Sequence, residues 1–387
     1  MDIACGDATD RLASSLADSF LAMTVEQNQG DKPLVRELNS FVESKSTFMR
    51  HASRYALPSL TPITLVLLLL PLLSGSLAAQ WSPLAAPPIG ATDGGVSFTI
   101  GDTAYVAGGI ANPRILSWHP TVGWRVVATF PDNRPRAWSF ALVHNAVAII
   151  GGGDSTGGFT LTDEVFEFNP MTGAVTPKNP MSFGARDGVW SFVIDGKGYV
   201  GGGFDGEFVI PDMWEYDFGN DSWRELPQPP IEALIFASSF VIDGRGYVVG
   251  GGIAFSGTTG LYEFDPETGG WRQRASFPGA PRQAGVAVAH DRAGYYGIGM
   301  DAYDTTFSDI WRYDPVADSW SLFRDDYPDF RSAWSSAFVL GNELIIGTGA
   351  GFPNGSLEFT RNFYATSLDE ESSVEERVRP VRTLTLE

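Results

Sequence analysis

Short apolar segments that end in glycine clusters recur through most of the chain. Apolar runs of about five residues predict β-strands when turn residues bound them. The segments read AYVAGG, AIIGGG, GYVGGG, YVVGGG, YYGIG and LIIGTG, with first glycines at Gly108, Gly151, Gly201, Gly250, Gly297 and Gly347. Successive first glycines are 43, 50, 49, 47 and 50 residues apart. This spacing predicts six repeats of one structural unit.

A second pattern follows each of the first five glycine clusters. It consists of an aromatic residue, a short polar residue, a polar turn and then usually Trp. The five copies are WHPTVGW, FNPMTGAV, YDFGNDSW, FDPETGGW and YDPVADSW, which begin at Trp118, Phe168, Tyr216, Phe264 and Tyr313. The short polar side chain can bond the turn backbone, so the pattern predicts a strand, a tight turn and a returning strand.

Each unit is thus expected to hold four short antiparallel strands, which is the composition of a β-propeller blade. The sixth unit ends at RNFYATSLD without a Trp-bearing fourth strand. The segment WSPLAAPP from Trp81 resembles WRELPQPP from Trp223, because both begin with Trp and end in Pro-Pro at the same spacing. We expect this N-terminal segment to supply the missing strand and to close the ring. The predicted fold class is all-β, a six-bladed propeller over residues 79–368.

The order of GG, aromatic-Asp-Pro and Trp resembles the kelch repeat, over roughly three quarters of the chain. Val175 replaces the Trp in the second unit, and the fifth and sixth units carry GIG and GTG. The resemblance implies a six-bladed kelch propeller closed by its N-terminal strand. It also implies that one mouth of the central channel binds partner peptides or sugars.

The segment before the repeats reads as a targeting signal. Residues 50–79 run from basic residues through an apolar stretch, Ile63 to Leu73, to small residues, which is the order of a secretory signal peptide. Met49 stands directly before the basic stretch, so we expect a signal peptide over 49–78 and a non-native extension over 1–48; whether Met1 or Met49 is the start stays open. The predicted location is extracytoplasmic, periplasmic or secreted. An uncleaved anchor that tethers the protein to a membrane is the alternative.

Cysteine and tryptophan mark the limits of the folded part. Cys5 is the only cysteine and precedes the signal, so the exported part has no disulfide. All 11 Trp residues lie at or after Trp81. The charged segment 369–387 lacks aromatic residues and is expected to be a flexible tail.

The charge excludes several classes of partner. The chain has 26 basic and 46 acidic residues, a net charge of −20, which argues against binding to a nucleic-acid backbone.

The sequence also lacks the motifs of common cofactor sites. No P-loop or dinucleotide-binding motif appears, so no nucleotide cofactor is expected. His119, His144 and His290 form no metal-binding pair, and no metal or other cofactor is predicted. The repeats resemble those of galactose oxidase-like propellers, but their copper site needs a cysteine, so copper oxidase chemistry is excluded.

Arginines at one place in the repeat form the candidate ligand site. Arg136, Arg186, Arg282 and Arg331 lie 15 or 16 residues before their glycine clusters, and Trp138, Trp190 and Trp334 follow them. The corresponding positions in the first and fourth units are near Thr92 and Ile235. We expect a partial ring of these arginines and aromatics at the channel mouth, suited to a protein partner, a glycan or a sugar acid. The alternative is a structural role in bonding neighbouring blades.

The leading hypothesis is an exported, monomeric propeller that binds a protein or carbohydrate at this Arg-rich mouth without chemistry of its own. A sugar mutarotase or epimerase is the alternative, because exported kelch propellers resembling this one include the N-acetylneuraminate epimerase. That resemblance implies catalytic roles for a Glu and an Arg, for which Glu207 and Arg186 are the candidates. A structural module of the cell envelope is the third hypothesis.

Overall fold

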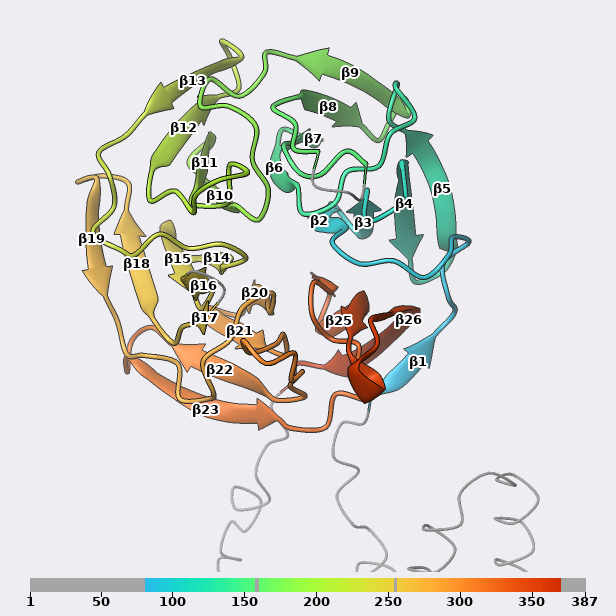
Figure 1. Ribbon diagram of the computed structural model, residues 1–387, viewed down its shortest axis with the longest axis vertical. Coiled ribbons are helices and arrows are strands. Elements are labelled where there is room, and N and C mark those ends of the chain that lie inside the picture. Colours follow the sequence, from blue (N-terminus) through green and yellow to red (C-terminus); the bar gives the residue numbers. More distant parts are fainter. Residues whose placement is uncertain (1–80, 157–159, 254–255, 370–387) are drawn as a thin grey trace, which may run out of the picture. The chain divides into compact units, whose positions relative to one another are not determined.

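The computed structural model describes residues 81–156, 160–253 and 256–369 (Figure 1). The predicted N-terminal extension, signal peptide and Cys5 lie outside the described residues, as does the tail after Asp369. In the described part of the chain, no helix is long and apolar enough to span a membrane.

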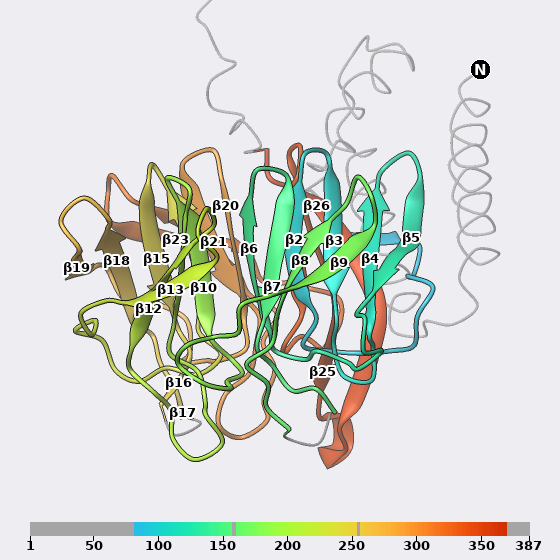
Figure 2. The same cartoon turned by 90° about the horizontal axis from the view of Figure 1, so that it is seen from above.

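The described residues form six four-stranded antiparallel sheets, arranged as blades around a central channel (Figures 1 and 2). Blade one contains β2 (Val96–Ile100), β3 (Thr103–Ala107), β4 (Arg114–His119) and β5 (Gly123–Thr129); blade two contains β6 (Phe140–His144), β7 (Val147–Gly151), β8 (Val165–Asn169) and β9 (Ala174–Lys178); blade three contains β10 (Trp190–Ile194), β11 (Lys197–Gly201), β12 (Met213–Asp217) and β13 (Ser222–Glu225). Blade four contains β14 (Ser238–Ile242), β15 (Arg245–Val249), β18 (Leu261–Asp265) and β19 (Gly270–Gln273); blade five contains β20 (Val286–His290), β21 (Ala293–Gly297), β22 (Ile310–Asp314) and β23 (Ser319–Arg324); blade six contains β24 (Ser336–Leu340), β25 (Glu343–Gly351), β26 (Glu358–Ser367) and β1 (Ser82–Leu84). The all-β, six-bladed prediction is confirmed.

The N-terminal strand completes blade six, as predicted. β1 pairs with β26 in antiparallel register, with Ser82 opposite Ala365. Trp81 is buried beside it, and its ring meets that of Tyr327 edge-on at a centroid distance of 5.2 Å. The Trp81 indole Nε1 also donates a hydrogen bond to Asp326 at 3.2 Å. The two ends of the propeller are therefore joined within one sheet, in which β1 is the outer strand.

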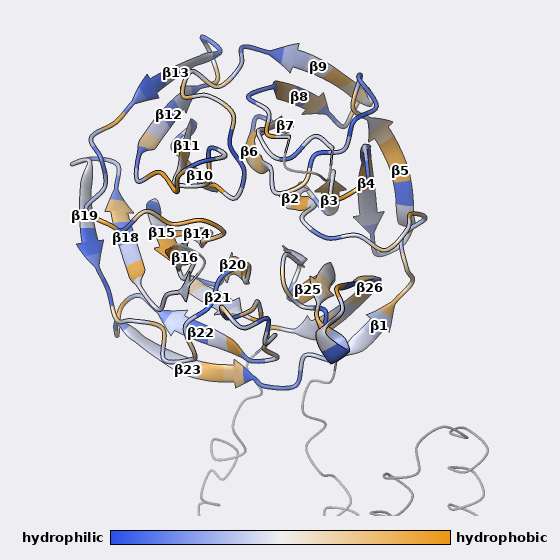
Figure 3. Ribbon diagram, viewed as in Figure 1, coloured by the Kyte–Doolittle hydropathy of each residue, from blue (hydrophilic) through white to orange (hydrophobic). Residues whose placement is uncertain are grey.

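Burial differs between the strands of a blade. The second strand is buried over most of its length, as in β15, whereas the outer strand β13 is largely exposed. Figure 3 shows the same difference, with β15 hydrophobic and β13 hydrophilic. Large side chains fill the space between blades: a Cβ on Gly198 would lie 2.5 Å from Leu142 of the preceding blade, so glycine is needed there. The hydrophobic core therefore lies between the sheets.

The glycine clusters join neighbouring blades. In every blade one glycine of the cluster donates its N–H to a carbonyl of the next blade. The six bonds are Gly109 to Arg136, Gly153 to Arg186, Gly203 to Leu234, Gly251 to Arg282, Gly299 to Ser332 and Gly349 to Thr92, at 2.6 to 3.3 Å. Gly109 has a φ of 107°, a conformation in which side chains other than hydrogen are strained. These bonds fix the equivalence of positions between blades.

Two hairpins extend the face on which the second and third strands of each blade are connected, called the loop face below. One consists of β16 (Gly252–Ile253) and β17 (Ser256–Gly257), and the other is the far end of β25 and β26 with the 3-10 turn Pro353–Gly355. Both project on the same side of the propeller in Figure 2.

Candidate binding site at the channel mouth

A closed ring of backbone hydrogen bonds surrounds the channel on the loop face. One residue from each blade takes part, and each N–H donates to the carbonyl of the preceding member at 2.7 to 3.0 Å. The members are Gly94, Trp138, Gly188, Phe236, Ala284 and Trp334, with Gly94 donating to Trp334. All six have φ between 53° and 64°. This left-handed conformation is costly for residues other than glycine, and the neighbouring blades hold it in place.

Small and aromatic residues alternate around this ring. Gly94, Gly188 and Ala284 are separated by Trp138, Phe236 and Trp334, and the three aromatic rings meet near the axis with centroid distances of 5.7 to 6.2 Å. We call these three aromatic residues the aromatic floor.

The small residues make the aromatic floor possible. A Cβ on Gly94 would lie 2.6 Å from the indole Nε1 of Trp138, and one on Gly188 would lie 2.9 Å from the ring of Phe236. The alternation therefore lets three large side chains fill a channel that has no room for six.

A cavity of about 460 Å³ lies against the aromatic floor on the loop face. The residue before each small member of the hydrogen-bonded ring contributes to its wall, and these residues are Asp93, Asp187 and Gln283. Loop residues complete it, among them Met300 and Leu357. The cavity thus combines an apolar base with polar groups from alternate blades, the usual composition of a ligand site.

A second cavity, of about 250 Å³, lies among the first residues of the inner strands. Ser97, Ser191 and Ser239 line it, and the hydroxyl of each donates to a backbone carbonyl of a neighbouring blade. These serines thus bond the blades to one another, so this cavity is the weaker candidate for a ligand.

Asp93 and Asp187 are the most unusual groups of the loop-face cavity. Their exposed fractions are 1% and 2%, and the Oδ1 atom of each has no hydrogen-bond partner among the described residues. Burial raises the pKa of Asp93 to about 7. Burial and, to a smaller extent, the charge of Asp154 raise the pKa of Asp187 to about 7. A buried carboxyl oxygen without a partner is costly, and it marks a site that a ligand can complete.

The indole nitrogens of the aromatic floor show the same feature. The Nε1 atoms of Trp138 and Trp334 are buried and have no acceptor in the described part of the chain. The cavity and its floor therefore hold both donors and acceptors that the fold itself does not satisfy.

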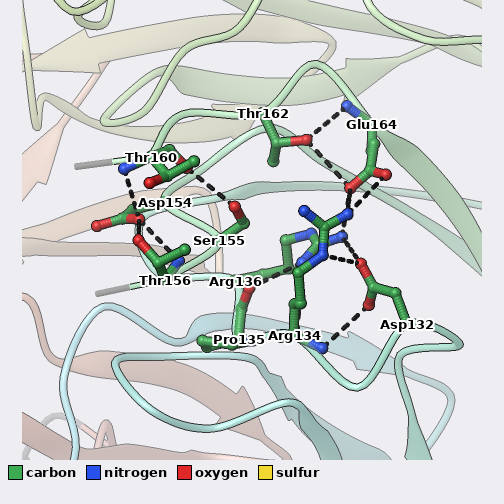
Figure 4. A network of polar contacts seen from close by, with 10 residues as sticks. All are labelled: Asp132, Arg134, Pro135, Arg136, Asp154, Ser155, Thr156, Thr160, Thr162 and Glu164. Carbon is green, nitrogen blue, oxygen red and sulfur yellow. Dashed lines mark hydrogen bonds and ion pairs between the residues drawn. The ribbon is translucent and has the colours of Figure 1, made fainter. Parts of the chain in front are cut away.

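Arg136, Arg186 and Arg282 do not face this cavity, which corrects the predicted ligand ring. All three are buried. Each guanidinium bonds carboxylates: Arg136 bonds Asp132 at 2.7 Å and Glu164 at 2.5 Å, Arg186 bonds Asp212 at 2.5 and 2.8 Å, and Arg282 bonds Asp309 at 2.6 and 3.1 Å. Figure 4 shows the first of these groups, in which Arg134 also contacts Asp132 and Glu164. These arginines fasten the loop before the third strand to the start of the same blade, a structural role. The bond between neighbouring blades that was the predicted alternative is not made by their guanidinium groups in the contacts described.

Arg331 stands one position away from the other three. The blade-to-blade hydrogen bonds show that Ser332, and not Arg331, occupies the position of the three arginines in blade six. In blade four that position is occupied by Leu234 rather than Ile235. The Arg331 side chain is 25% exposed and forms an ion pair with Asp329 at 2.8 Å. A direct ligand role remains a prediction for this arginine only.

The three predicted tryptophans lie in two environments. Trp138 and Trp334 form the aromatic floor and line the cavity, where a ligand role remains a prediction. Trp190 is buried between blades against Phe192 and Trp271, at centroid distances of 5.7 and 5.8 Å. It lies two residues beyond the hydrogen-bonded ring, so it belongs to the core and lines the second cavity, but not the loop-face cavity.

Glu207 and Arg186, the candidate catalytic pair, are not brought together. Glu207 is exposed in the loop between β11 and β12, where its backbone N–H donates to Asp205 at 2.8 Å. Arg186 is bound to Asp212, and no hydrogen bond or ion pair connects it to Glu207 among the described residues. The carboxyl groups with raised pKa are instead Asp93 and Asp187, which the sequence analysis missed because they do not recur in every repeat.

The described residues contain no group of three or more His, Cys, Asp or Glu side chains that could hold a metal ion.

Comparison with known proteins identifies the repeats. The family model of the KLHDC2/KLHL20/DRC7 kelch-repeats domain matches residues 136–349. The solved structure of YjhT is similar with a TM-score of 0.63 and 17% sequence identity, over 72% of this chain and 95% of that chain. A search of curated protein sequences found no significant match. Since 888 chains of solved structures match, the fold alone does not select a function.

Proposed function

Since the chain belongs to the kelch-repeat proteins, we propose that it is an exported, monomeric binding module whose loop-face cavity receives a segment of a protein partner. Kelch propellers commonly bind proteins. The observation that carries the proposal is the cavity itself, which has an aromatic floor and buried polar atoms without partners.

Apolar side chains on the loop face support a protein partner. Phe208, Tyr303, Phe330 and Leu357 are exposed, and they come from loops of blades three, five and six. Leu357 also lines the cavity, so it connects the exposed apolar surface with the cavity. Exposed aromatic residues around a desolvated pocket are typical of interfaces in which one buried side chain is the anchor.

Export is the part of the proposal that rests on residues 49–78. Replacing Leu65, Leu67 and Leu69 together by Asn interrupts the apolar stretch that a signal peptide needs. We expect the protein to remain in the cytoplasmic fraction after this change. Continued export of the variant would contradict the proposal.

A photo-crosslinking amino acid placed on the loop face tests the partner. Tyr303 and Val316 are equally exposed, at 88%, but Val316 lies in the turn between β22 and β23 on the opposite face. We expect the crosslinker at position 303 to capture a protein in the producing cells, and the crosslinker at 316 to capture none. Equal capture at both positions, or no capture at 303, would contradict a loop-face partner site.

A second candidate function is acid–base catalysis on a sugar, and one observation favours it. Asp93 and Asp187 face one cavity and have pKa values near 7, which suits proton transfer at neutral pH. One carboxyl would donate a proton to the ring oxygen of the sugar while the other, ionised, removes the proton of the anomeric hydroxyl, which opens the ring. The acidic wall favours a neutral sugar over a sialic acid.

Anomer exchange measured by proton NMR tests this candidate. Faster exchange of a neutral hexose with the full-length protein, lost in both Asp93→Asn and Asp187→Asn, would support it. Exchange that is unchanged by the protein for neutral sugars and for sialic acid would eliminate the enzyme.

A further inference from the structure

The ionisable groups of the loop-face cavity all carry the same sign of charge. Within the described residues they are Asp93 and Asp187 on the wall and Asp301 and Asp304 in the loop between β21 and β22. The nearby arginines do not reduce this charge, because Arg186 and Arg282 are bound to Asp212 and Asp309. An ionised ligand of this cavity is therefore expected to be a cation.

The wall offers acceptors to such a cation. The Oδ1 atoms of Asp93 and Asp187 are buried and have no partner in the described part of the chain, and both residues line the cavity. An ammonium group has three donors and no acceptor, so it can donate to an acceptor of this kind. The aromatic floor adds three aromatic side chains, a residue type to which a desolvated cation is attracted.

The remainder of the cavity is apolar and selects an organic cation over a metal ion. Met300, Phe352 and Leu357 line the wall, and a volume of about 460 Å³ exceeds the needs of a single ion. The described residues also lack a cluster of three metal-ligating side chains. An apolar stem that carries an ammonium group matches both the apolar wall and the two aspartates.

We propose that the loop-face cavity binds an alkylammonium group, presented by a lysine-type side chain of the protein partner. This inference rests on the proposed function and names the chemistry of its anchor. Lysine has the required form, a flexible apolar stem with a compact charge at its end. The partner is therefore expected to be a basic segment, complementary to a chain with a net charge of −20.

Binding of hexylammonium to the full-length protein tests the proposal, with hexanol as the uncharged probe of the same length. We expect saturable binding of hexylammonium at pH 8 by calorimetry, with shifts in the indole N–H NMR signals of Trp138 and Trp334. Hexanol is expected to bind at least about tenfold more weakly. Equal binding of the amine and the alcohol would overturn the proposal.

Matched variants locate the site. Asp93→Asn and Asp187→Asn should each weaken hexylammonium binding by about tenfold or more. Asp195→Asn removes the same charge from the exposed turn between β10 and β11, on the opposite face, and should leave binding unchanged. An equal loss in Asp195→Asn would assign the effect to net charge and overturn the proposal.

The two proposals fail in different ways. Hexylammonium binding without a crosslinked protein at position 303 would support the cation site and assign it to a free amine, while it contradicts the protein partner. A crosslinked protein without hexylammonium binding would keep the binding module and overturn the cation site.

Discussion

At the level of single residues, Asp93 and Asp187 provide polar groups to the cavity but lower the stability of the folded protein. The pKa of each is about 7 in the folded protein, above its ordinary value of 3.8. A carboxyl whose pKa is raised by folding contributes its full stability only at a pH below the pKa that it has in the unfolded chain. That contribution is lost as the pH rises through the pKa of the folded protein, which is about 7. Both carboxyls are therefore expected to destabilise the empty protein at neutral and higher pH.

Asp187→Asn should consequently raise the melting temperature at pH 8. The free energy of unfolding at pH 8 should rise by roughly 1 to 4 kcal/mol, since each unit of pKa shift corresponds to about 1.4 kcal/mol. The gain should shrink as the pH falls from 7 toward 4. The charged group that acts on this carboxyl is Asp154, whose repulsion is relieved as well. Thermal unfolding between pH 4 and 8, with Asp195→Asn as the control, measures the effect; a variant less stable than the parent at pH 8 would refute the argument.

Arg282 is expected to matter for stability because it pairs with Asp309. Its guanidinium is buried, bonds both carboxylate oxygens and lies 4.0 Å from the ring centroid of Phe307. Burial opposes ionisation of Asp309, but the hydrogen bonds and charge of Arg282 outweigh it and lower the pKa of that carboxyl. Without the arginine, a half-buried carboxylate would have no cation.

Arg282→Ala should therefore cost about 3 kcal/mol or more in the free energy of unfolding, measured by urea denaturation. Arg292→Ala is the matched control, because Arg292 pairs with Asp243 on the surface. That change should cost less than about 1 kcal/mol. Similar losses in the two variants would show that burial of the Arg282 pair contributes little.

Sequence reasoning placed these arginines correctly along the chain but not in space. Repetition identified the position before each inner strand, yet it contains no information on which way a side chain points. The acidic partners Glu164, Asp212 and Asp309 each stand directly before the third strand of their blade. This position was not connected with the arginines in the sequence analysis, because the two positions are separated by two strands along the chain. Asp93 and Asp187 were missed because only alternate blades carry a polar residue there.

At the level of elements, the three-residue strand β1 closes the propeller, and Trp81 is its main anchor. Trp81→Ala removes the contact with Tyr327 and the hydrogen bond to Asp326. We expect a loss of about 3 kcal/mol, the usual cost of deleting a buried large aromatic side chain. Hydrogen exchange should accelerate in the backbone amides of β26, while blade three keeps its protection. Uniform acceleration in all blades would contradict a local closure.

The closure could be predicted because its Trp belongs to a pattern that repeats. The β16–β17 hairpin and the extension of β25 and β26 beyond Gly347 could not, because their residues carry neither the apolar period nor the turn sequence of the other strands. Such segments are held by bonds to adjacent loops, as when Arg282 N–H donates to Thr258. Sequence periodicity is insensitive to contacts of this kind.

At the level of the whole molecule, six similar blades build a site of approximate threefold character. Blades two, four and six contribute Trp138, Phe236 and Trp334, and blades one, three and five contribute the polar wall. The sixfold repeat was visible in the sequence because backbone geometry imposes it. The alternation of small and aromatic residues was not visible in the sequence, because it depends on the width of the channel, which admits three aromatic rings.

The charge of the whole molecule should act on the rate at which a cation reaches this cavity. A net charge of −20 attracts cations over distances that salt screens, whereas contacts with Asp93 and Asp187 act after arrival. The association rate constant of hexylammonium, obtained from NMR line shapes, should therefore fall several-fold between 20 mM and 500 mM NaCl. Asp187→Asn should raise the dissociation rate constant at every salt concentration and leave the salt dependence of association nearly unchanged. An association rate constant independent of salt would show that the surface charge has no part in recognition, and the two aspartates would then have to account for it alone.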